Sequence, residues 1–144
     1  MSSIFGTKAT LLYDVNLLLQ ILILILLFIG RKFVKDKKHK NHGIMMTIAV
    51  TLHTISILLI MIPSFVTYFG LLISSFSLGI VITWIHAIVG ILAEVLGIFI
   101  VVKWRFQPEP MKICGKRRKF MIPLFILWTF ALILGIAFYI QYYL

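Results

Sequence analysis

The sequence predicts an all-α, polytopic membrane protein built as a bundle of four transmembrane helices. Of its 144 residues, 62% are hydrophobic and only 12% are charged, and the apolar residues fall in long unbroken runs. A soluble globular domain usually carries about 25% charged residues, and a water-soluble core of this size could not bury such runs. We therefore expect a single transmembrane domain over residues 1–144.

Four runs are long enough to cross a bilayer, which requires about 20 mostly apolar residues per helix. In the first of them the positive charges follow the apolar run instead of preceding it. That order differs from a cleavable signal peptide, so we expect a retained first helix. The predicted spans are 11–30, 43–65, 80–102 and 120–144.

The basic residues predict the orientation of the chain. All of the 14 Lys and Arg except Lys8 lie in two hydrophilic segments between the runs, and there are only 4 Asp and Glu. Basic loops of membrane proteins stay in the cytoplasm, so this placement favours a plasma-membrane protein with both termini on the outer side over a nucleic-acid-binding protein. The first segment contains Arg31, Lys32, Lys35, Lys37, Lys38 and Lys40, and the second contains Lys103, Arg105, Lys112, Lys116, Arg117, Arg118 and Lys119.

The remaining connections are less polar. Residues 63–79 carry no charge, so we expect this outer connection to lie in the membrane interface or to pack on the bundle. Two prolines in 107–110 should end the third span. The lone cysteine, Cys114, permits neither an intramolecular disulfide nor a thiolate metal cluster.

Two ionisable side chains are predicted to lie deep in the spans and at the same level. Counted from the cytoplasmic ends at about 1.5 Å per residue, His53 lies about 15 Å deep and Glu94 about 12 Å deep. A hydrogen bond between them is therefore the natural geometry. Such residues are costly in a membrane and face the bundle interior or a cavity. Either they hold the bundle together, or they serve a cofactor or a proton pathway.

The third span also carries a stripe of small residues beginning at His86 and running through Gly90, Ala93 and Gly97. Small residues in membrane helices usually admit another helix, but the same clearance suits a heme beside a histidine ligand. The candidate cofactor ligands are His86, His53 and His42, with heme b as the group. His53 and His86 would both ligate only if the helices tilt or a span boundary is shifted. His42 shares a helix face with His53 but lies about 16 Å from it. We interpret Met45, Met46 and Met61 as packing residues and expect no metal site.

A polar stripe on the first span contains Tyr13, Asn16 and Gln20, with Asp14 beside it. Lipid offers these groups no hydrogen bonds. The stripe is therefore expected to contact another helix, either in this chain or in a partner subunit.

Catalytic motifs are absent from the sequence. It has no glycine-rich phosphate loop, no HExxH zinc helix and no nucleophile elbow. Only Glu94 is a deep carboxylate, which does not suffice for a two-carboxylate site. We therefore predict a protein that is not an enzyme.

The last three spans resemble the family of small four-helix membrane proteins that includes the bacterial heme-copper oxidase assembly factor CtaM. The similarity rests on His42 with Met46, on His86 before a Gly/Ala-rich helix, and on a basic segment leading into a last helix with Trp128, Gly135 and Tyr139. Where the family pattern would have a histidine in that basic segment, this chain has Arg117. We place Arg117 with Glu94 among the expected buried polar residues. The resemblance implies a non-catalytic factor of a respiratory or copper-containing membrane oxidase.

Three functions follow as hypotheses. The first is an accessory or assembly subunit of a redox membrane complex, of the respiratory oxidase or copper monooxygenase type, with the lipid bilayer and larger membrane subunits as partners. The second is a small b-type heme electron-transfer protein with His53 and His86 as ligands. The third is a proton-conducting or transport protein that uses His53 and Glu94, although the chain lacks the inverted repeat common in transporters. Whether the chain forms homo-oligomers stays open.

Overall fold

The structure, a computed structural model, describes residues 4–6, 8–74, 76–105 and 110–143, and for 110–118 it describes the backbone alone. Throughout the described part of the chain the regular elements are helices, and no strand occurs there. The elements are α1 (Leu11–Lys35), α2 (His39–Ser56), the π-helical segment η1 (Ile57–Met61), α3 (Ile62–Ser74), α4 (Leu78–Arg105) and α5 (Pro110–Tyr143).

Among the described residues, four helical stretches are long and apolar enough to cross a membrane, which confirms the predicted number of spans and the multi-pass membrane architecture. They all start or end beyond the predicted limits, and the second is much longer than predicted. These stretches are Leu11–Lys35, His39–Ser74, Leu78–Arg105 and Lys119–Tyr143.

The basic segments, predicted as loops, are largely helical. The first is divided between the end of α1 and the start of α2, and the backbone from Pro110 to Lys119 belongs to α5. Lys and Arg are good helix formers, and their long side chains can reach the aqueous interface from a helix end. The helices therefore continue past the apolar runs.

A tight turn joins α1 to α2. Lys37 adopts a left-handed conformation with φ of 58°. Its N–H donates to Val34 O at 3.1 Å, and the N–H of Lys38 donates to Phe33 O at 2.8 Å. This is the Schellman arrangement, which satisfies the last carbonyls of a helix and usually places glycine at the left-handed position.

The second span continues through η1 into α3. Pro63 is the second residue of α3, and a proline ring clashes with the carbonyl four residues earlier, here that of Leu59. A wider π-helical turn just before the proline is the local accommodation. Residues 63–74 of the predicted outer connection 63–79 are therefore helical, yet no residue of α3 is buried. Its contact with α4 is aromatic, because the rings of Phe65 and Trp84 lie edge to face with centroids 5.3 Å apart.

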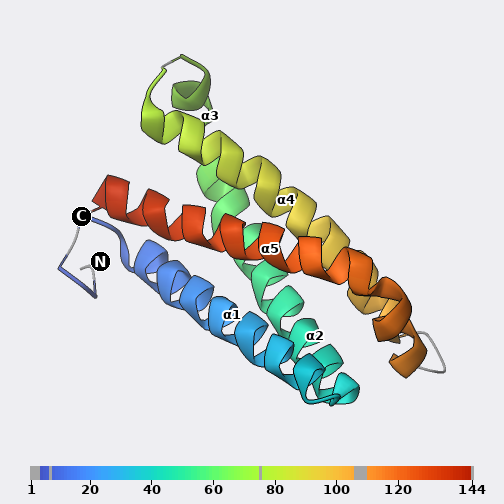
Figure 1. Cartoon of the computed structure of the whole chain (residues 1–144). Coiled ribbons are helices and arrows are strands. Elements are labelled where there is room, and N and C mark those ends of the chain that lie inside the picture. Colours follow the sequence, from blue (N-terminus) through green and yellow to red (C-terminus); the bar gives the residue numbers. More distant parts are fainter. Residues whose placement is uncertain (1–3, 7, 75, 106–109, 144) are drawn as a thin grey trace.

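The four long helices close into a bundle in which α1 contacts α2 and α5, and α4 contacts α2 and α5 (Figure 1). The two ends of the chain lie at the same end of the bundle (Figure 1), where the N–H of Lys8 donates to Tyr143 O at 3.3 Å. The buried apolar core lies midway along the bundle and contains Ile23, Leu27, Ala49, Val50, Ala93, Trp128 and Leu132.

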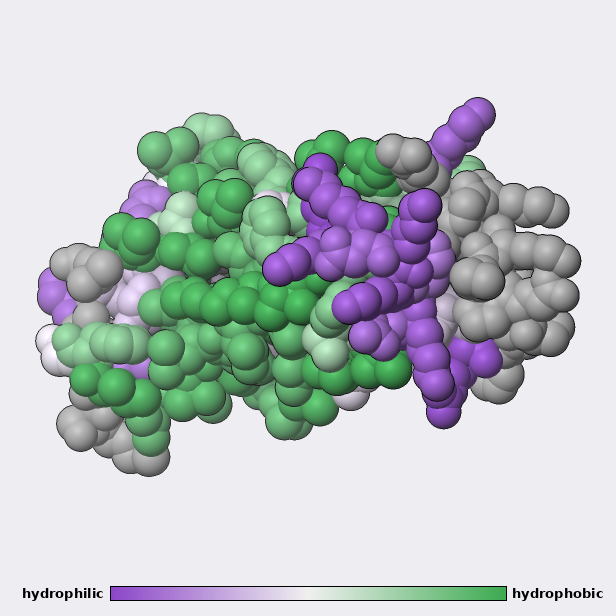
Figure 2. All heavy atoms as spheres, turned by 60° about the horizontal axis from the view of Figure 1, so that its bottom comes forward, coloured by the Kyte–Doolittle hydropathy of each residue, from purple (hydrophilic) through white to green (hydrophobic). Residues whose placement is uncertain are grey.

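The surface is divided between apolar and basic areas. Figure 2 shows a mainly apolar face with hydrophilic side chains gathered toward one end. At the α1–α2 connection six basic side chains are exposed: Arg31, Lys32, Lys35, Lys37, Lys38 and Lys40.

Candidate functional site

The centre of the bundle contains a hydrogen-bonded cluster of His53, Thr54 and Glu94, which we call the central polar cluster. His53 Nδ1 and Glu94 Oε2 are 2.7 Å apart, and only 2% of His53 and 6% of Glu94 are exposed. The predicted hydrogen bond between α2 and α4 is thereby confirmed. The prediction was correct because the rise per residue of a helix determines how deep each side chain lies in its span. By that count His53 and Glu94 lie at nearly the same depth.

Thr54 was not predicted as a member of this cluster. Its hydroxyl lies within hydrogen-bonding distance of both Glu94 Oε1 and the carbonyl oxygen of Val50. A hydroxyl has one hydrogen to donate. The Thr54 hydroxyl can therefore donate to only one of these two oxygen atoms at a time.

The polar stripe of α1 meets α2 within this chain. Ser56 Oγ donates to Asn16 Oδ1 at 2.5 Å, and Gln20 Nε2 donates to Ser56 Oγ at 3.1 Å. Gln20 is 3% exposed, and its Oε1 atom is buried without a hydrogen-bond partner. Of the two partners left open by the sequence, these bonds favour the intrachain one, and a contact of Asn16 or Gln20 with another subunit stays a prediction.

A third polar group lies nearer the chain termini. Asp14 is fully buried and accepts hydrogen bonds from the Tyr139 hydroxyl and from the N–H of Ile4, the latter at 2.6 Å. Tyr13 stacks on Tyr143 with ring centroids 5.3 Å apart, and its hydroxyl lies 3.2 Å from Ser64 Oγ. These contacts join α1 to α5 and α3.

His86 lies against α5. Its Nδ1 donates to the carbonyl oxygen of Ala131 at 2.9 Å. A Cβ atom added to Gly135 would lie 3.0 Å from the imidazole, so the ring rests directly on that glycine. The absence of a side chain at Gly135 of α5 therefore leaves room for the imidazole of His86 from α4.

The small-residue stripe of α4 contacts Trp128 of α5 at Gly97. A Cβ atom added to Gly97 would lie 3.0 Å from the Trp128 indole, and that indole also packs against His53, with ring centroids 5.5 Å apart. A heme held flat on this stripe would have to occupy the space of Trp128. At the Gly97 end of the stripe the residues present therefore favour helix packing, whereas at Gly90 nothing lies within 4 Å of an added Cβ atom.

His42 has a different hydrogen-bond partner from His53 and His86. Its Nδ1 donates to the carbonyl oxygen of Gly30 in α1 at 2.9 Å. The three histidines thus bond to three different helices and form no joint site. Within the described ranges no three His, Cys, Asp or Glu side chains lie close enough to hold a metal ion together. Arg117 belongs to 106–118, whose side chains lie outside the description, so its predicted burial stays a prediction.

Two hydrogen-bonded groups were not predicted from the sequence. They are the pair Asp14–Tyr139 and the triad of Asn16, Gln20 and Ser56. Each contains a polar residue in a span, which was the available signal. The choice of partner depends on which helices are neighbours, and a hydropathy pattern does not specify that. Searches of protein-family models, curated proteins and solved structures found no match to this chain.

Proposed function

We propose that this chain is a non-catalytic accessory or assembly subunit of a redox membrane complex, of the respiratory oxidase or copper monooxygenase type. The observation that carries the proposal is the His53–Glu94 bond, in which the two deepest ionisable side chains use each other as partners and join α2 to α4. Buried polar groups matched in this way stabilise a helix bundle. The resemblance of the last three spans supports the redox complex as the setting.

The proposed orientation has both termini on the outer side of the plasma membrane and the basic helix ends in the cytoplasm. The distribution of Lys and Arg supports it. Cys114, the one cysteine, belongs to the second basic segment and reports on this orientation directly. A membrane-impermeant maleimide should label it in inverted vesicles but not in intact cells. Labelling in intact cells would overturn the orientation.

The accessory role is tested by deleting the gene in the native cell. We expect the membranes to lose assembled oxidase or monooxygenase, measured by the absorption of its hemes or by its copper content together with native gel electrophoresis. Re-expression of the wild-type chain should restore the complex. A full amount of assembled complex in the deletion strain would contradict the proposal.

A second candidate is proton conduction, and a specific observation favours it. Polar groups recur along the interior, from Asp14 and Tyr139 through Asn16, Gln20 and Ser56 to the central polar cluster. Buried chains of this kind mark proton relays in other membrane proteins. Proteoliposomes with a trapped pH dye should acidify under a proton gradient with the wild-type chain and not with Glu94→Gln. Equal rates for both would exclude this candidate.

A further inference from the structure

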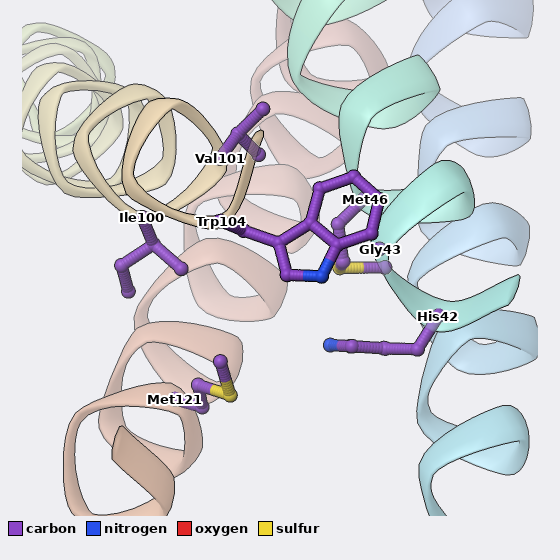
Figure 3. A pocket seen from close by; sticks show the side chains of 7 residues that line it. All are labelled: His42, Gly43, Met46, Ile100, Val101, Trp104 and Met121. Carbon is purple, nitrogen blue, oxygen red and sulfur yellow. The ribbon is translucent and has the colours of Figure 1, made fainter. Parts of the chain in front are cut away.

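A small pocket opens where the ends of α2, α4 and α5 meet, next to the basic end of the bundle (Figure 3). Its volume is about 20 Å³, enough for one water molecule or one metal ion. Four of its lining side chains carry the chemistry: His42 and Met46 from α2, Trp104 from α4 and Met121 from α5. It lies apart from the central polar cluster.

His42 is prepared to act as a ligand. Its Nδ1–H is held by the carbonyl oxygen of Gly30 at 2.9 Å, so in the neutral ring Nε2 carries the lone pair. Figure 3 shows this tip of the ring directed toward the space between Trp104 and Met121. Metal-binding histidines commonly donate their other ring N–H to a backbone carbonyl, which fixes the tautomer and the ring orientation. The imidazole therefore presents one oriented nitrogen to the pocket.

The other donors are soft. Met46 and Met121 contribute thioether sulfurs from two different helices, and the sulfurs lie on either side of the His42 tip in Figure 3. Thioethers bind Cu(I) and related ions and are poor ligands for Mg²⁺ or Ca²⁺. One imidazole and two thioethers, all uncharged, suit a soft monovalent cation in a region of low dielectric.

We propose that His42 Nε2, Met46 Sδ and Met121 Sδ form a three-coordinate site for one soft monovalent cation, Cu(I) or Ag(I), with the Trp104 indole beside it. The exposed basic side chains nearby do not forbid the ion, since they are solvated and the Arg31 guanidinium rests on the Phe125 ring, 4.9 Å from its centroid. Coordination to sulfur is largely covalent in character, which sets it apart from a surface ion pair. The site does not depend on the role proposed above.

The site brings together residues that the sequence keeps apart. His42 and Met46 are one turn apart in α2, but Met121 lies in the last helix. From the sequence alone we interpret Met45, Met46 and Met61 as packing residues, and no pattern in the sequence places Met121 beside Met46. Only the bundle arrangement, in which α4 lies against both α2 and α5, does so.

Silver titration of the purified full chain tests the site. The titration uses Cys114→Ser protein, because the thiol of Cys114 would itself bind the ion, in a chloride-free buffer with mild detergent. We expect one Ag(I) per chain by mass spectrometry of the metal content, with quenching of tryptophan fluorescence that disappears in Trp104→Phe. Cu(I) in competition with bicinchoninate should occupy the same site.

Conservative variants identify the ligands. Met46→Leu and Met121→Leu keep the volume of the side chain and should each weaken Ag(I) binding by at least about tenfold. Met45→Leu, on the same helix, is the matched control and should leave the affinity unchanged. His42→Gln should weaken binding as the methionine variants do.

Three results would overturn the proposal. The first is no saturable Ag(I) or Cu(I) binding, as expected if a water molecule fills the pocket and bridges Trp104 Nε1 and His42 Nε2. The second is binding that Met46→Leu and Met121→Leu leave unchanged. The third is an equal loss in Met45→Leu, which would show that unspecific contact with methionines accounts for the signal.

Discussion

Helix α4 and helix α3 are both mainly apolar, yet α4 is part of the bundle core and no residue of α3 is buried. The large apolar side chains of α4 face outward, including Ile88, Ile91 and Val95, each of them more than half exposed. The residues that α4 does bury are Gly79, Gly90, Ala93, Glu94 and Gly97.

The difference shows what selects the interior of this protein. Lipid is as apolar as leucine, so hydrophobicity alone drives no helix into the bundle. Small residues that permit close approach and polar groups that find partners do so. Helix α4 supplies both at its buried face, whereas the polar contact of α3 with α1 is made by Ser64, which is not buried.

The largest effect should come from the polar residue that α4 buries. Glu94→Leu removes the partner of His53 Nδ1 and one of the two partners of the Thr54 hydroxyl, which leaves the imidazole N–H without a bond in an apolar interior. We expect the free energy of unfolding to fall by about 2 kcal/mol, measured by titration with sodium dodecyl sulfate in mixed micelles. Val95→Leu, on the exposed face next to it, is the control. Equal stability of the two variants would contradict a structural role for Glu94.

A glycine in each helix sharpens the comparison. In Gly97→Leu the new side chain meets the Trp128 indole, whereas at Gly70 in α3 nothing lies within 4 Å of an added Cβ atom. Overpacking should cost Gly97→Leu about 1–2 kcal/mol of unfolding free energy, and Gly70→Leu should be neutral or slightly stabilising because leucine is the better helix former. The same detergent titration compares them. A larger loss at Gly70 would mean that α3 packs on something in the folded protein.

The polar stripe of α1 should have a smaller effect. Asn16→Leu together with Gln20→Leu removes both bonds to Ser56. Since hydrogen bonds between membrane helices average well under 1 kcal/mol each, we expect a total loss of about 1 kcal/mol. The loss should occur in the isolated chain, by the same titration. Unchanged stability of the isolated chain, with loss of a co-purifying subunit, would instead assign the stripe to a partner.

The smallest effect concerns the α1–α2 turn and is a gain. Lys37 holds a left-handed φ of 58° that glycine adopts without steric cost. Lys37→Gly should raise the unfolding free energy by about 0.5–1 kcal/mol, whereas the neighbouring Lys38→Gly should not. A shift in the midpoint of thermal unfolding in detergent measures both. A loss of stability in Lys37→Gly would argue against the left-handed turn.

The sequence predicted the number of spans and one of the three polar groupings correctly, and the physical reason is the same in both cases. A helix advances a fixed distance per residue, so twenty apolar residues specify a span, and counting along two helices places His53 level with Glu94. What a count along one helix cannot supply is the order of helices around the bundle. The pairs Asp14–Tyr139 and Asn16–Ser56 depend on that order, and so does the approach of Met121 to His42.

The extents of the helices were missed for a different reason. Charge was taken as the end of each span, but Lys and Arg are compatible with helix, so α1 continues to Lys35 and α5 already includes Lys119. The absence of charge in 63–79 likewise indicated that this segment lies in the membrane interface or against the bundle, but it did not indicate its secondary structure. Its helical structure over Ile62–Ser74 depends on local propensity after the π-helical turn.

The most direct test of the structural account is a double-mutant cycle on the central polar cluster, with His53→Leu, Glu94→Leu and the double variant compared with the wild-type chain. If the two side chains hold α2 to α4, their effects on the unfolding free energy should be coupled by about 1 kcal/mol or more, and the double variant should be more stable than additivity predicts. Additive losses would mean that the two residues do not stabilise the bundle through each other.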